Sequence, residues 1–338
     1  MTSGADTFVA VEAFGHAQID WLRRVVPLAG GVPSHDTLSR VFALVDRTHF
    51  EHSFAAWAAE AFEKTDGQIV AIDGKRLRRA HDAGDSVMSV VFHPTEVGWA
   101  WATESGAALG QVATTYGEGE TAAIPRLLAL LDLSGCIVTL DAAGCQTGIA
   151  EQIRSQGGDY VLCVKGNQLY LSDDCERWIE DAVARGTADT FETAERGHGR
   201  EEHRRYWSVA VPDAAFRPTL WAGLTSVGMV EARRRVGGKT SVEHRRFATS
   251  LPVGAETLAR AVRGHWGIEN GLHWTLDVAF REDESRTRAA HAASNLSVVR
   301  RVSATLIKAE PSGKGGVQTR RMRAAWDGAY RGRVLGLQ

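Results

Sequence analysis

Two aspartates stand where they could bind a metal ion. Asp73 follows the short β-branched run 69–72, and Asp141 follows a second apolar run, 137–140. If both runs are neighbouring strands of one sheet, both carboxylates lie at the same edge. Neighbouring carboxylates repel each other unless a cation lies between them, and hard oxygen donors suit Mg²⁺. The pair predicts a metal site, although an aspartate that ends a strand also commonly caps a turn.

A third acidic residue lies in a stretch with helical periodicity, VRGHWGIENGLHWTLDVAF. In it His265, Glu269, His273 and Asp277 recur every four residues and form one polar stripe. The stripe has three interpretations. The first is a solvated face, and the second is a zinc site, but the two histidines would be about 12 Å apart along the helix, too far for one ion. In the third, Glu269 points at the sheet edge and completes a trio with the two aspartates.

The order of the predicted elements indicates an α/β fold. Residues 8–64 have helical periodicity, and residues 69–164 read as a strand, two further strands, a helix, a strand, a helix and a strand. This order is typical of a mixed sheet with right-handed crossovers, in which ligands bind where strands end. The third interpretation of the stripe therefore requires the later helix to reach that edge.

The pattern changes at about residue 190. Arg-rich strands separated by glycines follow to about 250, and helical periodicity returns at 256–280 and 289–308. We predict five segments, which are an N-terminal helical segment (1–65), the first part of a core (66–185), a β-rich, Arg-rich insertion (186–252), helices that complete the core and carry Glu269 (253–310) and a basic tail (311–338).

Composition indicates an ordinary folded protein. The 338 residues are 44% hydrophobic and 24% charged, which is typical of globular chains. No apolar run approaches the roughly 18 to 20 residues that span a bilayer, and the N-terminus does not read as a leader. The four cysteines fit neither a zinc site nor a disulfide framework. We expect a cytoplasmic protein with reduced cysteines and no membrane partner.

The formal net charge of −2 conceals an uneven distribution of charge. Residues 196–246 contain 11 Lys and Arg against 5 Asp and Glu, and residues 281–338 contain 12 against 5. The rest of the chain is acidic. Two basic flanks around an acidic centre suit a polyanion that is held near a metal site, although charged residues also collect on any solvated face.

Several motifs together resemble one known family. AIDGKRLRR, CIVTLDAAGCQTGIAEQI, GGDYVLCVKGNQ and HWGIENGLHWTLDVAFREDESRTR are similar, in this order, to motifs of the DDE transposases of ISAs-type insertion sequences, the H-repeat-associated proteins. The resemblance runs from about residue 14 to the C-terminus. It implies a ribonuclease-H-like mixed sheet with flanking helices, interrupted by a mostly β insertion, and a truncated form of the family's N-terminal helical region. Asp73, Asp141 and Glu269 match the family's catalytic, metal-binding acids.

This resemblance implies a bacterial enzyme that cuts and joins DNA at the ends of its own mobile element. Two Mg²⁺ or Mn²⁺ ions held by the trio would activate a water or a DNA 3′-hydroxyl and stabilise the leaving oxygen. The implied partners are double-stranded DNA, both the terminal inverted repeats and the target, and a second copy of the chain on DNA, at the nucleoid. Two alternatives stay open, a catalytically inactive DNA-binding remnant and a metal-dependent nuclease without strand transfer.

Further residues are expected around the three acids. His265, Asn270 and His273 lie in the signature helix and are predicted to hydrogen-bond to Glu269 or to a phosphate. Contacts with DNA are predicted for Lys75, Lys165, Asn167, Arg200, Arg204, Arg205, Arg233, Arg234 and Arg235. The alternative is that these groups are ordinary surface residues and that the arginines keep an edge strand soluble.

Overall fold

The computed structural model describes residues 1–61, 67–76, 86–93, 107–114, 120–197, 199–212 and 220–337. The chain folds into two compact units, each with its own packed interior. Unit 1 comprises Met1–Glu63, Gly74–Leu131 and Gly267–Gln338, and unit 2 comprises Lys64–Asp73 and Asp132–Trp266. The predicted boundary at residue 65 lies outside the described residues, and the division into five segments stays a prediction.

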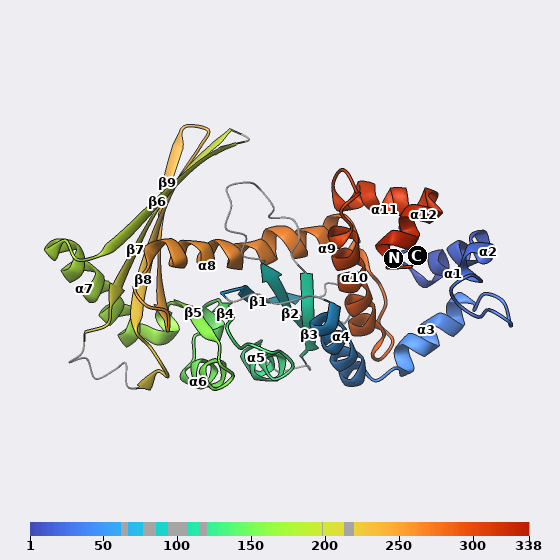
Figure 1. Cartoon of the computed structure of the whole chain (residues 1–338), viewed down its shortest axis with the longest axis horizontal. Helices are drawn as coiled ribbons and strands as arrows, with labels where there is room; N and C mark the ends of the chain where they lie inside the picture. Colours follow the sequence, from blue (N-terminus) through green and yellow to red (C-terminus); the bar gives the residue numbers. More distant parts are fainter. Residues whose placement is uncertain are drawn as a thin grey trace. The chain divides into compact units, whose positions relative to one another are not determined.

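Unit 2 is built on a mixed sheet with the strand order β1-β4-β5-β9-β8-β7-β6 (Figure 1). The first three strands are parallel to one another, and all later pairs are antiparallel. The predicted mixed α/β fold is therefore confirmed. The strands are β1 (Ile69–Arg76), β4 (Ile137–Leu140), β5 (Asp159–Val164), β6 (Asp189–Gly197), β7 (Arg200–Ala210), β8 (Ser226–Val236) and β9 (Lys239–Thr249).

Helices pack on the sheet of unit 2 because both of its faces are apolar at its centre. Helix α8 (Ala255–Gly267) buries Leu258 and Val262 in one cluster with residues of β1, β4, β5 and β9. Gly264 permits this close packing, since a Cβ there would lie 2.9 Å from Ile69 Cγ2. The remaining helices of the unit are α6 (Thr147–Ser155) and α7 (Leu169–Arg185).

Strands β6 to β9 extend past the parallel strands as a long four-stranded arm (Figure 1). The last residue of β5, Val164, pairs with Arg246, whereas β9 begins at Lys239. The seven residues of β9 that precede Arg246 add about 24 Å at 3.4 Å per residue. Gly237 and Gly238, with φ of 55° and 80°, join β8 to β9, as a tight hairpin of this kind requires. Because β5 ends where the arm starts, the arm projects beyond the carboxyl ends of the parallel strands.

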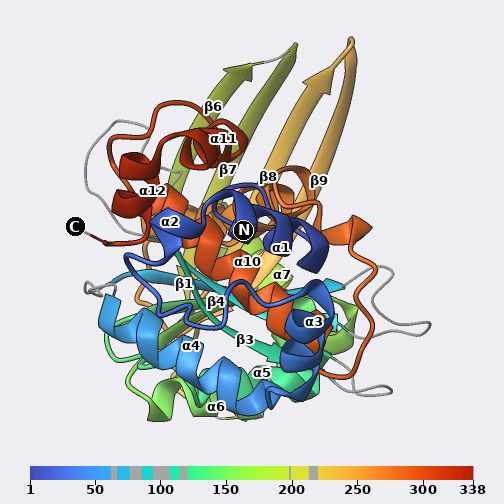
Figure 2. The same cartoon turned by 90° about the vertical axis from the view of Figure 1, so that its right-hand side faces the viewer.

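Unit 1 combines the N-terminal and C-terminal helices with one hairpin (Figure 2). Helix α10 (Ala292–Ala309) is mostly buried and packs against α3, α4 and β3. None of the helices in the described ranges has an apolar stretch of the length that a bilayer requires. The other elements are α1 (Phe8–Ala17), α2 (Ile19–Leu22), α3 (His35–Leu44), α4 (Arg47–Ala61), β2 (Ser86–His93), β3 (Ala107–Ala113), α5 (Glu120–Leu128), α9 (Trp274–Val278), α11 (Val317–Trp326) and α12 (Gly328–Val334).

A buried carboxyl joins α4 to β3. Glu51 is only 4% exposed and accepts a hydrogen bond of 3.0 Å from the backbone N–H of Ala113. Burial raises the pKa of Glu51 from 4.5 to about 7, because the charged form loses its contact with water.

Glu51 should make unit 1 less stable as the pH rises. Between pH 4.5 and about 7 the unfolded chain releases this proton while the folded chain keeps it, so the free energy of unfolding falls by up to roughly 3 kcal/mol. Glu51→Gln should remove that part of the pH dependence, measured by urea unfolding at pH 5 and pH 8. Glu60→Gln, on an exposed position of the same helix, is the control. A Glu51→Gln protein with the wild-type pH dependence would contradict this account.

Candidate functional site

Asp73 and Asp141 occupy matching positions on neighbouring parallel strands. In the register of β1 and β4, Ile72 pairs with Leu140, and the two aspartates are the next residues in the chain. Asp141 directly follows β4 as predicted, whereas β1 continues past Asp73 to Arg76 and only its pairing with β4 ends before Asp73. Neighbouring strands lie about 4.8 Å apart. Asp141 is exposed and Asp73 is partly buried. The structure therefore brings these two predicted residues together at the carboxyl edge of the sheet.

Asp141 also caps a turn, as the alternative interpretation expected. Its Oδ1 accepts hydrogen bonds from the backbone N–H groups of Ala143, at 3.0 Å, and Gly144, at 3.4 Å, in the 3-10 turn η1 (Ala142–Gly144). No hydrogen bond to Oδ2 is present within the described part of the chain. The cap fixes the carboxylate and leaves one oxygen available for another ligand, so the two roles are compatible.

The adjoining end of β5 is tied to the same turn. Lys165 follows β5 and is exposed. Asn167, in the 3-10 turn η2 (Gly166–Gln168), donates a 2.6 Å hydrogen bond from Nδ2 to the carbonyl oxygen of Ala142. Asn167 thus holds η2 against η1, and Lys165 lies beside Asp141.

A pocket opens beside Asp141 on the face of the sheet that α8 covers. Lys165 and His265 line it, and so do two residues outside the predicted set, Arg245 and Trp266. The guanidinium of Arg245 lies 4.2 Å from the centroid of the Trp266 ring and its Nε donates to Glu243 Oε1 at 2.7 Å. The other lining residues are Thr139, Leu140, Val161, Cys163, Phe247 and Val262.

Thr139 orients the predicted site residue His265. Its Oγ1 lies 3.1 Å from His265 Nδ1. Burial lowers the pKa of His265, although the nearby Asp141 carboxylate acts in the opposite direction. The imidazole is therefore neutral at neutral pH and carries one N–H. Thr139 precedes Asp141 by two residues and so shares its side of the strand, which is a signal that the sequence contained.

Glu269 and Asn270 lie in a π-helical segment, η4 (Ile268–His273), which follows α8 directly in the chain. Their side chains lie outside the described part of the structure. Segments of this type are rare and are frequently found at functional sites. In the same segment burial lowers the pKa of His273 to about 3, with Arg301 and Lys75 acting in the same direction, so that His273 is also neutral. The contacts predicted for Glu269 stay predictions.

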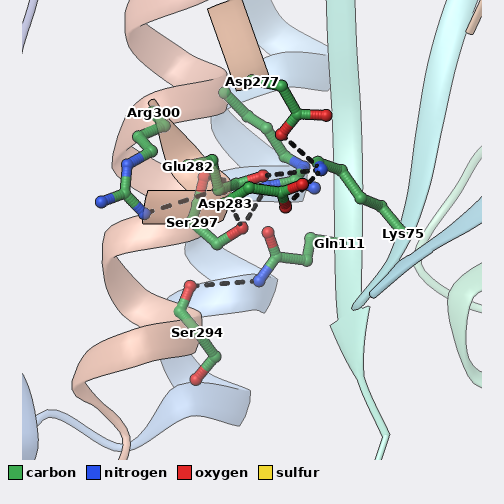
Figure 3. Close-up of polar contacts among 9 residues, drawn as sticks. Lys75, Gln111, Asp277, Glu282, Asp283, Ser294, Ser297 and Arg300 are labelled. Carbon is green, nitrogen blue, oxygen red and sulfur yellow. Dashed lines mark hydrogen bonds and ion pairs between the residues drawn. The ribbon is translucent and has the colours of Figure 1, made fainter. Parts of the chain in front are cut away.

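Lys75, predicted to contact DNA, lies inside unit 1. It is 7% exposed, and its Nζ lies 2.7 Å from Asp277 Oδ1 and 3.3 Å from Asp283 Oδ1 (Figure 3). Glu282 Oε2 is 4.0 Å away. Three carboxylates therefore already surround this ammonium group. Asp277, which the helical stripe singled out, is the partner of Lys75.

Glu282 continues this network into the interior of unit 1. Its side chain is fully buried, and its Oε1 accepts a hydrogen bond from Ser297 Oγ at 2.9 Å. Arg301 Nη1 lies 3.3 Å from the same oxygen. Arg300 Nη1 lies 3.7 Å from it (Figure 3). Glu282 was not among the predicted residues, and nothing in a run of three consecutive acids shows which one is buried.

The six arginines predicted to contact DNA lie on the arm and alternate between its two faces. Arg200, Arg204 and Arg205 belong to β7, and the other three belong to β8. Register places Arg200, Arg204 and Arg234 on one face of the arm and Arg205, Arg233 and Arg235 on the opposite face.

The residues present fit a divalent cation. Two carboxylates at matching positions supply the hard oxygen donors that such ions prefer. Among the side chains that the structure describes, no group of three or more His, Cys, Asp or Glu residues surrounds a common point. The carboxylate of Glu269 is not among those side chains.

Comparison with known proteins agrees with these features. A family model described as "Transposase DDE domain" matches residues 64–306, and one described as "DDE_Tnp_1-associated" matches residues 1–58. The chain is 36% identical to "Putative transposase YncI" of Escherichia coli O157:H7, over 98% of this chain and 85% of the relative. It is 34% identical to "H repeat-associated putative transposase YhhI" of Escherichia coli K12, over 98% of this chain and 88% of the relative.

These matches cover most of the chain and agree with the strand order of unit 2. The DDE transposase domain is ribonuclease-H-like, which confirms the predicted fold class. Domains of this family generally use divalent metal ions. The resemblance seen in the separate motifs is confirmed as well. The chain belongs to the family of DDE transposases that includes the H-repeat-associated proteins.

Proposed function

We propose that the protein is the transposase of a bacterial insertion sequence and that it cuts and joins DNA strands at the ends of that element. One observation carries this proposal, namely the matching positions of Asp73 and Asp141 at the carboxyl edge of β1 and β4, beside a pocket with two cations. Membership of the family supports it. The chain passes from α8, which lines that pocket, directly into the segment that contains Glu269.

Asp73, Asp141 and Glu269 are the proposed ligands of two divalent ions, Mg²⁺ or Mn²⁺. When bound, such ions lower the pKa of a water or orient a DNA 3′-hydroxyl, and they stabilise the leaving oxygen of the phosphodiester. The η1 cap holds the Asp141 carboxylate in one orientation, so its second oxygen is presented to a ligand without loss of side-chain freedom on binding.

The pocket residues orient the DNA strand beside these acids. Lys165 and Arg245 supply positive charge for a phosphate, and Arg245 is held in place by Trp266 and Glu243. His265 is neutral and fixed by Thr139, so a ring N–H can donate to a DNA oxygen without adding charge. Asn270 and His273 are proposed to support Glu269 from the same helical segment.

The proposal is tested with a labelled duplex that ends in the terminal inverted repeat of the element, a supercoiled target plasmid and Mg²⁺. We expect strands cut at the repeat and labelled product joined to the plasmid. Cut strands without any joined product would overturn strand transfer and favour a nuclease. Binding of the duplex without cut strands would overturn both activities and favour a DNA-binding remnant.

Double-stranded DNA is the proposed partner, and a second copy of the chain would hold the other end of the element. A protein with this activity works at the bacterial nucleoid in the cytoplasm. The copies of the chain in each complex are counted by size-exclusion chromatography with light scattering. We expect one copy on a duplex with one repeat end and two copies on a substrate with both repeat ends. One copy on a two-ended substrate would contradict the paired arrangement.

A further inference from the structure

The arm of unit 2 has two chemically different faces. The face that continues the surface on which α8 packs is called the α8 face. The opposite face is called the far face. Register places the even-numbered residues of β7 and β8 and the odd-numbered residues of β9 on the α8 face. At its base the far face packs against α7 instead, where Arg246 Nη2 lies 2.5 Å from Glu176 Oε1.

The α8 face is continuous with the pocket beside Asp141. Along β9, Phe247 and Arg245 line the pocket, and Glu243, Ser241 and Lys239 follow on the same face toward the tip of the arm. A strand of DNA bound at Asp141 would meet this face of the arm on leaving the pocket. Among the described residues, α7 covers the base of the far face and separates it from the pocket.

Ion pairs neutralise several of the arginines on both faces. On the far face Arg205 Nε lies 3.0 Å from Glu192 and Arg233 Nε lies 2.9 Å from Glu231. On the α8 face Arg204 lies between Glu202, at 2.5 Å, and Glu195, at 3.6 Å, and its side chain is only 13% exposed. These arginines are occupied by carboxylates of the arm itself.

Exposed cations without an ion pair remain near the tip. Within the described part of the arm, Arg234 and Lys239 on the α8 face form no ion pair, and neither does Arg235 on the far face. Arg234 and Arg235 are adjacent, exposed and identical in type, so they differ chiefly in the face to which they belong. Of the two faces in the described part of the arm, the α8 face is the one that joins its unpaired cations to the pocket with Lys165.

We propose that the α8 face of the arm binds the phosphate backbone of the DNA duplex next to the scissile phosphate, and that the far face does not. This assignment rests on the function proposed above. The arm extends about 24 Å beyond β5, which corresponds to about seven base pairs at 3.4 Å per step. Lys239 and Arg234 supply the contacts near the tip, and the exposed Lys165 supplies the contact at the pocket.

Two double variants with equal charge changes test the assignment. Arg234→Gln with Lys239→Gln removes two cations from the α8 face, and Arg233→Gln with Arg235→Gln removes two from the far face. The probe is a fluorescein-labelled duplex with the terminal inverted repeat, and Ca²⁺ replaces Mg²⁺ so that no strand is cut. Fluorescence anisotropy gives the dissociation constant between 0.05 and 0.3 M salt, values on the order of physiological ionic strength. Circular dichroism checks that both proteins fold.

The α8-face pair should weaken binding by roughly thirtyfold at 0.15 M salt and reduce the slope of log affinity against log salt by about 2, because two phosphate contacts are lost. The far-face pair should stay within about twofold of the wild type, since salt screens charges that make no contact. Equal losses from both pairs, or a larger loss from the far face, would overturn the assignment but not the proposed cleavage. A second outcome is that only the α8-face pair weakens binding while the wild-type protein never cuts the repeat in Mg²⁺. That outcome would overturn the proposed cleavage but not the assignment of the faces.

Discussion

Asp73→Asn and Asp141→Asn should each lower the rate of strand cleavage by about a thousandfold or more. Each change keeps the shape of the side chain and removes the negative charge that would hold a divalent ion, which corresponds to a loss of about 4 kcal/mol in transition-state stabilisation. The fold should persist in both variants, because Asp73 is only partly buried and asparagine at position 141 also caps turns of the η1 type. The measurement is the single-turnover rate of cutting at the terminal repeat as a function of Mg²⁺ concentration.

The matched control for these variants is Asp173→Asn. Asp173 is an exposed aspartate of the same unit, on α7, so its replacement changes the net charge equally without touching the sheet edge. It should cut DNA at the wild-type rate. If Asp141→Asn cut DNA at the same single-turnover rate as this control, Asp141 would not be a ligand of a catalytic metal ion.

Glu282→Gln should destabilise unit 1 by about 3 to 5 kcal/mol. The side chain of Glu282 is fully buried among Lys75, Arg300 and Arg301, and it supplies the negative charge closest to Arg301. Removing that charge leaves buried cations without compensation, which costs more than the ion pairs themselves contribute. Urea unfolding at constant pH measures the loss.

Glu284→Gln is the corresponding control, two residues away. Glu284 is exposed and pairs with the exposed Arg281, so its removal should cost less than about 1 kcal/mol. Equal effects from the two variants would contradict the structural role of Glu282.

Loss of this network should also slow DNA cleavage. Lys75 follows the proposed metal ligand Asp73 by two residues, and Asp277 follows the proposed ligand Glu269 by eight, so both segments that carry these ligands are anchored by the network.

The predicted basic tail shows why charge counts alone mislead. Residues 311–338 are rich in arginine, yet Arg321 and Arg331 are each only 2% exposed. Arg320 donates hydrogen bonds to the carbonyl oxygens of Ile307 and Glu310, near the end of α10, where helix carbonyls lack partners. These arginines contribute to packing rather than to a basic surface, and composition cannot distinguish the two uses.

Local patterns in the sequence were sufficient for the sheet edge. An apolar run followed by an acid is a local feature of the sequence, and the predicted neighbouring positions of Asp73 and Asp141 agree with the register of β1 and β4. The β-rich insertion was also predicted, because strand periodicity and glycine turns are properties of neighbouring residues. The shared motifs then identified the family without knowledge of the fold.

Only the tertiary structure decided which charged groups are free to act. Lys75 and Asp277 are 202 positions apart, and their ion pair exists because a strand and a helix pack together. Likewise, the face of each arginine on the arm follows from the register of strands that are far apart in sequence. The sequence by itself determined the elements, the order of the acids and the family, since these depend on short-range preferences. Burial, partner and face depend on long-range contacts, and the amino-acid order does not reveal these until the chain is folded.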